Sequence, residues 1–290
     1  MGQRVLLLGA HGHVGRALQR SVTPDIHLVA LGSGDADITD AAAVDAAVAE
    51  VRPATIINCA GFTHVDNAES QPDRAAALNS HAPRQLAAIA MRHGVRLVHL
   101  STDYVFDGVS SSPYETSAFT SPLSVYGRTK ADGENAVLAM GEQAAVVRTA
   151  WVHSVLAVNF VRAVCDHVMN GKTMRVVNDQ VSTPTQAGHL AHALWALVAR
   201  PEVHGMLHFT DAGSASRYDV AMATSRELVR RNPSWSADLI VPVPTREYPT
   251  PARRPLYSVL DKHSSWNAIG YMPPHWMDGV TQTVREVLDA

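Results

Sequence analysis

The first half of the chain alternates short apolar runs with longer, alanine-rich segments. The apolar runs are RVLLLG (4–9), IHLVAL (26–31), ATIINCA (54–60), VRLVHLS (95–101) and AAVVRTA (144–150). Each run has the length of a β-strand, and each intervening segment can form a helix that leads to the next parallel strand. Strands covered by helices on both faces are apolar throughout rather than alternating. The pattern therefore predicts an α/β fold built on a doubly wound parallel sheet.

After Trp151 this rhythm loosens. Helical patterns such as GHLAHALWALVA and SRYDVAMATSRELVRR alternate with the short strand candidates MRVV and MLHFT, and a proline-rich stretch follows. Proline cannot donate to a central strand ladder, so residues 242–255 are expected to form loop or edge structure. We predict a first domain over 1–150, with a later contribution from 175–210, and a smaller, interleaved lobe over 151–290.

Composition narrows the class of protein. The 290 residues are 46% hydrophobic and 18% charged, which is typical of a globular protein, and the formal net charge of −3 includes no Lys/Arg run. These values argue against nucleic acid or a membrane surface as a partner. Two cysteines, Cys59 and Cys165, cannot form a framework of disulfides. With neither a signal-like N-terminus nor a long apolar run, the expected protein is soluble and cytoplasmic.

A glycine-rich turn, GAHGHVG, follows the first apolar run and opens the first helical segment. Glycines at this position allow backbone N–H groups to approach a pyrophosphate, which then lies at the positive end of the helix. The order strand, glycine turn, helix is the context that the dinucleotide motif requires. We therefore expect a Rossmann-like NAD(P)-binding domain in which the turn contributes Gly9, Gly12, His13, Val14 and Gly15.

The second strand ends without the acidic residue that commonly binds the adenosine ribose. Gly32 occupies this position, and no arginine stands beside it to bind a 2′-phosphate. The cofactor is therefore expected to be NADPH or NADH, and the choice between them stays open. Just beyond, Asp37 and Ile38 can contact the adenine or form a plain turn.

Tyr126 lies four residues before Lys130 in VYGRTK, in a chain with only three lysines. This spacing puts a phenol and an ammonium on one helix face, where the lysine is expected to lower the pKa of the tyrosine. The fourth apolar run leads into Ser101, Thr102 and Asp103, at the strand end where open α/β sheets bind ligands. Tyr126 is thus a candidate general acid, Lys130 its support, and Thr102 a hydrogen-bond donor to the reacting oxygen.

The sequence resembles the dTDP-4-dehydrorhamnose reductase family of the extended short-chain dehydrogenase/reductases. The resemblance covers nearly the whole chain and rests on GAHGHVG, NCAGFTHVDNAES (58–70), STDYVFDG (101–108), SPLSVYGRTKADGE (121–134), RTAWV (148–152), VVNDQVSTPT (176–185) and YPTPARRPLYSVLD (248–261). It implies hydride transfer to the C4 ketone of dTDP-6-deoxy-L-lyxo-4-hexulose, which yields dTDP-L-rhamnose. It also implies that the second lobe binds this nucleotide sugar.

The resemblance carries roles onto individual residues. Tyr126 would donate the proton, Lys130 would hold the nicotinamide ribose, and Thr102 would polarise the carbonyl. Further cofactor contacts fall on Ala60, Gly61, Thr63 and Asn79. Substrate contacts fall on Asp103, Tyr104, Val105, Trp151, Arg253 and Arg254, where the two arginines suit a diphosphate or form a solvated surface pair.

Several positions depart from the family pattern. AWVHSVLAVNF (150–160) replaces a Gly/Asn-rich loop, so the sugar pocket can differ. Ala17 and Gly188 stand where some relatives carry glutamates linked to metal-assisted dimerisation, so no metal is expected and a homodimer is left open. Fifteen histidines form no ligand set with usual spacing. The acidic segment 66–69 is expected to cap the following helix or to touch the cofactor.

Alternative functions remain. A reductase of the same mechanism could act on another nucleotide-linked 4-keto-6-deoxy sugar. A 4,6-dehydratase needs an Asp-Glu pair after the Ser/Thr, whereas this chain has Asp103-Tyr104. Some family members are regulatory subunits, such as that of methionine adenosyltransferase, although the intact Thr102, Tyr126 and Lys130 favour an enzyme.

Overall fold

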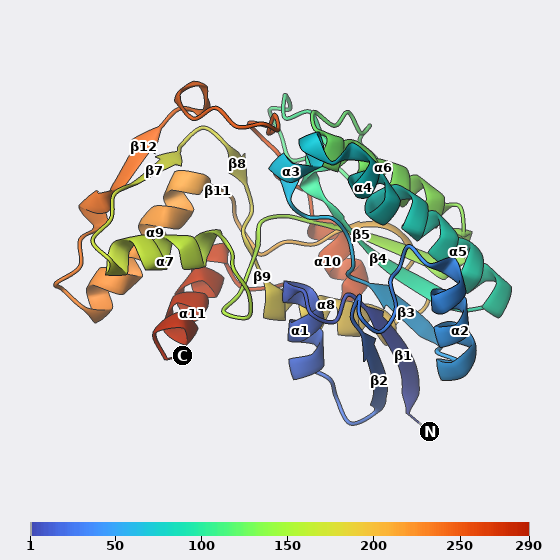
Figure 1. Ribbon diagram of the computed structural model, residues 1–290. Helices are drawn as coiled ribbons and strands as arrows, with labels where there is room; N and C mark the ends of the chain where they lie inside the picture. Colours follow the sequence, from blue (N-terminus) through green and yellow to red (C-terminus); the bar gives the residue numbers. More distant parts are fainter. Residues whose placement is uncertain (1, 290) are drawn as a thin grey trace.

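The computed structural model describes residues 2–289 and is built around a six-stranded sheet with the strand order β10-β5-β4-β3-β1-β2 (Figure 1). Every neighbouring pair in this sheet is parallel. The strands are β1 (Gln3–Leu8), β2 (Ile26–Leu31), β3 (Thr55–Asn58), β4 (Arg96–Thr102), β5 (Ala144–Thr149) and β10 (Gly205–His208). The predicted α/β class and doubly wound parallel sheet are confirmed. The strand order reverses between β1 and β3, where such sheets bind ligands.

Helices cover both faces of this sheet. One face carries α2 (Ala41–Val51), α5 (Ala82–His93) and α6 (Val125–Leu138); the other carries α1 (His13–Arg20), α8 (Ala187–Val198) and α10 (His263–Ile269). Successive side chains of β1 point to opposite layers: Val5 and Leu7 pack with α1 and α8, and Leu6 and Leu8 pack with α2 and α5. This double burial explains why the strands are apolar at consecutive positions.

A second, smaller lobe lies beside the carboxyl ends of the large sheet (Figure 1). Its core joins three helices, α7 (Phe160–Met169), α9 (Arg217–Arg231) and α11 (Trp276–Leu288). Two two-stranded sheets complete it: β7 (Met174–Val177) with β12 (Ile240–Val243), and β8 (Val181–Ser182) with β11 (Ala215–Ser216). A third pair, β6 (Val152–His153) with β9 (Thr185–Gln186), contacts both parts: Val152 packs against the core of the large sheet, and His153 bonds Thr283 of α11.

The chain passes between the large sheet and the smaller lobe more than once. β7 pairs with β12 in the smaller lobe, whereas α8 and β10 return to the large sheet and α10 packs beside α8. The proline-rich stretch begins in β12, an edge strand of a two-stranded sheet, where Pro242 is tolerated. The C-terminal α11 ends in the smaller lobe (Figure 1).

Short helical segments line the edge where the sheet meets the smaller lobe. They are α3 (Val65–Ser70), α4 (Pro72–Ala76), η1 (Ala77–His81) and η2 (Asp103–Val105); the remaining turns are η3 (Gly141–Gln143), η4 (Ala237–Leu239) and η5 (Thr245–Glu247). Over residues 2–289, no helix is long and apolar enough to cross a membrane.

Candidate active site

The glycine turn brings β1 and α1 close to the end of β3. Gly9 has a φ of +87°, which favours glycine, and a Cβ at this residue would lie 2.6 Å from the backbone nitrogen of Ala60. A Cβ on Gly15 would overlap the carbonyl oxygen of Gly9. Gly12 is the N-cap of α1, so free N–H groups and the positive helix end face the cavity beside the turn. This cradle suits a pyrophosphate.

A cavity of about 940 Å³ extends from the ends of β1 and β2 to the N-terminus of α9. Most of the predicted cofactor residues line it, namely Gly9, Gly12, His13, Val14, Asp37, Ile38, Ala60, Gly61, Thr63 and Asn79. The predicted residues Thr102, Asp103, Tyr104, Tyr126, Lys130 and Trp151 line the same cavity. The fold thus brings together residues from opposite ends of the first 151 positions. Gly15 lies beneath the turn instead, where its missing side chain allows the close packing.

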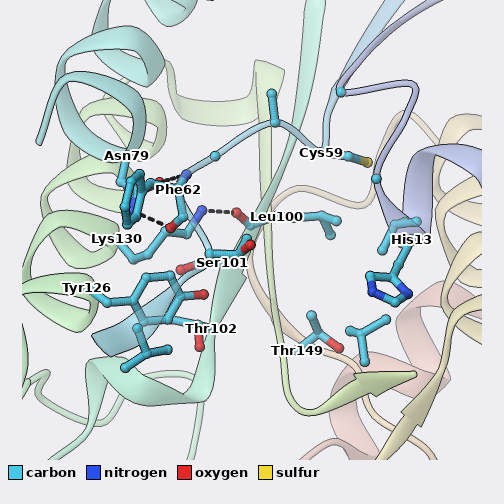
Figure 2. Close-up of a pocket in the computed structure, with 18 of the residues that line it drawn as sticks. His13, Cys59, Phe62, Asn79, Leu100, Ser101, Thr102, Tyr126, Lys130 and Thr149 are labelled. Atoms are coloured by element: carbon cyan, nitrogen blue, oxygen red, sulfur yellow. Dashed lines mark hydrogen bonds between the residues drawn. The ribbon is translucent and has the colours of Figure 1, made fainter. Parts of the chain in front are cut away.

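Tyr126 and Lys130 project from the first turns of α6, which begins after the N-cap Ser124. Figure 2 shows both side chains on one side of the cavity, with Thr102 below the phenol and His13 across the cavity. The Lys130 ammonium donates to the carbonyl oxygen of Leu100 at 2.6 Å. Asn79 holds the neighbouring loop: its side chain accepts from the N–H of Phe62 at 2.8 Å and donates to the carbonyl of the same residue at 3.0 Å.

Burial dominates the electrostatics of this pair. It raises the pKa of Tyr126 well above its usual value, and the nearby Asp103 carboxylate adds to the rise. It lowers the pKa of Lys130 to about 8. The predicted lowering of the Tyr126 pKa by Lys130 is therefore wrong, because the ammonium points to the Leu100 carbonyl and burial outweighs its effect. The phenol stays protonated at neutral pH, which is the form that a proton donor requires.

Asp103 is turned toward the smaller lobe rather than into open space. Its side chain is 1% exposed and accepts hydrogen bonds from Ser182 at 2.9 Å and Ser258 at 2.5 Å. Thr102 donates to its other oxygen at 3.2 Å. Burial raises the pKa of Asp103 to about 6, although these hydroxyls act in the opposite direction. Both carboxylate oxygens therefore already accept hydrogen bonds, and those from Ser182 and Ser258 join the end of β4 to the smaller lobe.

Three predicted substrate residues lie outside the cavity lining. Val105 is fully buried and packs with Phe106 and Leu260 in a separate apolar cluster. Arg253 is exposed. Arg254 forms a salt bridge with Asp66 at 2.7 Å, so its charge is already paired.

The acidic segment 66–69 does not cap the next helix. The Asp66 carboxylate accepts from Arg254 and from the N–H of Ala252, and Glu69 accepts from the N–H of Val125. The predicted capping role is therefore wrong, because these two carboxylates bind backbone and side-chain donors far away in the sequence. Together they fix the 250–254 loop and the start of α6 near the cavity.

Sequence analysis missed Arg217, which lines the far end of the cavity together with Phe160 and Val220. Arg217 is the first residue of α9, directly after the N-cap Ser216. A cation is disfavoured in the first turn of a helix, and such local conflicts often mark functional sites. An arginine directly after a predicted helix N-cap is therefore the sequence signal that could have identified Arg217 as a site residue.

Comparisons with known proteins agree with this geometry. The family model described as the RmlD substrate binding domain matches residues 3–288. A probable dTDP-4,6-dihydroxy-2-methyloxan-3-one 4-ketoreductase of Streptomyces antibioticus is 42% identical, over 99% of this chain and 96% of its own length. The dTDP-4-dehydrorhamnose reductase of Mycolicibacterium smegmatis is 40% identical, over 100% of this chain and 88% of its own.

The fold agrees over the same extent. The crystal structure of dTDP-4-dehydrorhamnose reductase from Bacillus anthracis in complex with NADP superposes with a TM-score of 0.91 at 30% identity, and the match covers 99% of this chain and 100% of that one. With a matching family model, full-length relatives and a shared fold around one cavity, the chain belongs to the dTDP-4-dehydrorhamnose reductase family.

Proposed function

We propose that the protein uses NADPH or NADH to reduce the C4 ketone of dTDP-6-deoxy-L-lyxo-4-hexulose, which yields dTDP-L-rhamnose. The observation that carries this proposal is the shared cavity of the glycine turn and the residues Thr102, Tyr126 and Lys130. A dinucleotide at the turn and a ketone beside the phenol would then lie within one continuous space.

Each of these three side chains has a separate task. Tyr126 donates its phenolic proton to the C4 oxygen as the ketone becomes an alcohol. Thr102 is only 6% exposed and donates its hydroxyl proton to Asp103 in this structure; rotated toward the ketone, the same proton would polarise the carbonyl. Lys130 holds the nicotinamide ribose. When bound, the dinucleotide supplies the hydride that C4 receives.

The turn and the ends of β2 and β3 would hold the dinucleotide. Gly9, Gly12, His13 and Val14 suit the pyrophosphate, since N–H groups and a positive helix end meet there. Asp37 and Ile38 lie at the adenine end, and Asp37 also accepts from Thr39 in a local turn at 2.9 Å. Gly32 itself has no acidic side chain, but the Asp35 carboxylate accepts from its N–H at 2.8 Å, so both NADPH and NADH are kept in the proposal.

Reduction of a related 4-keto-6-deoxy sugar is the second candidate. It is supported by the name of the Streptomyces antibioticus relative and by the unusual 150–160 segment, from which Trp151, Val158 and Phe160 line the cavity. This segment leads from the large sheet into the smaller lobe. We propose the smaller lobe as the substrate-binding part, and 1–150 with a later contribution from 175–210 as the cofactor-binding part. A nucleotide cofactor and two free cysteines favour the cytoplasm as the compartment.

The test is a substrate panel with purified protein. Oxidation of NADPH and of NADH is followed by absorbance, with dTDP-6-deoxy-L-lyxo-4-hexulose and with its C3 and C5 epimers. Fastest turnover of the L-lyxo sugar, with dTDP-L-rhamnose as product, is expected. Preference for another epimer would move the assignment to the second candidate. No oxidation with any sugar would favour a regulatory subunit instead.

A further inference from the structure

Arg217 lies where the cavity leaves the large sheet and enters the smaller lobe. Its neighbours in the cavity wall come from three elements: Trp151 follows β5, Phe160 begins α7, and Val220 belongs to α9. None of the proposed roles of Thr102, Tyr126 or Lys130 uses it.

Aromatic rings hold the guanidinium in place. The Cζ atom of Arg217 lies 3.8 Å from the ring centroid of Trp151 and 5.1 Å from that of Phe160. A guanidinium stacked in this way keeps its N–H groups at the edge, free for a planar acceptor. Burial lowers the pKa of Arg217, while the Tyr104 hydroxyl and the Asp103 carboxylate favour its charged form.

The charge of Arg217 has no close counterion. In the part of the chain that the structure describes, no carboxylate lies within salt-bridge distance of it, whereas the nearby Arg254 is paired with Asp66 at 2.7 Å. The closest carboxylate that acts on it, Asp103, is bonded to Ser182 and Ser258. A partly buried cation without a salt bridge, at the unfavourable end of a helix, is costly unless an anion binds there.

Tyr104 is a neighbour of both the phenol and the cation. Its ring packs edge to face with Tyr126 at 6.1 Å between centroids, and its hydroxyl favours the charged form of Arg217 and also that of Arg254. Tyr126 and Arg217 line one cavity, so a nucleoside diphosphate sugar with its C4 at Tyr126 would share that cavity with Arg217.

We propose that Arg217, together with the Tyr104 hydroxyl, binds the diphosphate of the substrate, in place of the Arg253 and Arg254 pair expected from the sequence. This inference rests on the proposed function, because it takes the substrate to be a nucleoside diphosphate sugar. The guanidinium offers two parallel N–H donors to the phosphate oxygens, and Tyr104 adds a third donor.

The test compares Arg217→Gln with wild type and with Arg246→Gln, which removes an arginine whose side chain is 82% exposed. Calorimetric titration with dTDP and with thymidine, on protein saturated with NADP⁺, separates the phosphates from the nucleoside. Loss of a charge-assisted bidentate contact is expected to weaken dTDP binding about 10- to 100-fold, with thymidine binding unchanged. The substrate KM should rise by a similar factor, and kcat should change less than about threefold.

Equal dTDP affinity in wild type and Arg217→Gln would overturn the inference. So would a larger loss of affinity in Arg253→Gln. If the Gln variant does not fold, Arg217→Met retains the aliphatic packing on Trp151 and is compared with wild type in the same dTDP titration. The outcome is independent of turnover: a wild type that binds dTDP through Arg217 but reduces no 4-keto sugar would refute the proposed function alone.

Discussion

The carboxylate of Asp103 is a buried acid that joins β4 to the smaller lobe, and its replacement by asparagine tests this arrangement. Asp103 receives hydrogen bonds from Ser182 at 2.9 Å and Ser258 at 2.5 Å, and its side chain is 1% exposed. Burial raises its pKa to about 6 from the ordinary aspartate value of 3.8. The folded protein therefore retains a proton at a pH where the unfolded chain has lost it.

This difference fixes the sign of the pH dependence. Between about pH 4 and pH 6 the folded state binds more protons at Asp103, so the free energy of unfolding falls as the pH rises. Between about pH 5 and about pH 7.5 the unfolded carboxyl is already ionised, and only the folded carboxyl releases a proton. The starting pH lies about one unit below the folded pKa, and one pKa unit corresponds to about 1.4 kcal/mol. The wild type should thus lose about 1.4 kcal/mol from this group over that interval. Asp103→Asn has no titrating group at this position, so it does not lose this free energy.

Urea unfolding of both proteins at about pH 5 and about pH 7.5 measures the effect. The free energy of unfolding of Asp103→Asn minus that of wild type should be about 1.4 kcal/mol more positive at the higher pH, because only wild type loses stability. Asp132→Asn, which removes an exposed carboxylate from α6, controls for charge alone. An identical wild-type-to-variant difference at both pH values would refute the reasoning.

Two further experiments test the parts that border the cavity. Gly15→Ala should abolish dinucleotide binding, since its Cβ would overlap the Gly9 carbonyl, whereas Gly34→Ala, with no atom within 4 Å of the new Cβ, should bind normally in the same titration. Equal binding by both variants would contradict the proposed cradle. A double-mutant cycle over Asp66→Asn and Arg254→Met should give a coupling of about 0.5 to 1 kcal/mol by urea unfolding, reduced by the 36% exposure of Asp66. A coupling of zero would show that the 250–254 loop does not depend on this pair.

The large sheet could be predicted because its strands are buried on both faces. All five apolar runs of the first half became strands, with ends shifted by a few residues; IHLVAL coincides with β2 (Ile26–Leu31). The smaller lobe gave weaker signals. β6, β8, β9 and β11 have two residues each, too few for any periodicity. The pairing of β7 with β12 joins residues more than sixty positions apart, which local patterns do not encode.

In the site, local motifs predicted residues on one element better than contacts between elements. The glycine turn and the Tyr126–Lys130 pair depend on a strand end and a helix face, and both line the cavity. Arg254 was expected to face the substrate on the basis of its charge, but its partner Asp66 lies 188 positions away. The pKa of Tyr126 likewise depends on burial among elements distant in sequence.

The most direct test of the central claim is the reduction of dTDP-6-deoxy-L-lyxo-4-hexulose by wild type and by Tyr126→Phe. The account predicts that wild type forms dTDP-L-rhamnose with matching oxidation of NADPH or NADH. Removal of the proton donor should lower kcat about 100- to 10,000-fold, with cofactor affinity changed by less than about threefold. Full activity of Tyr126→Phe, or no product from wild type, would contradict the account.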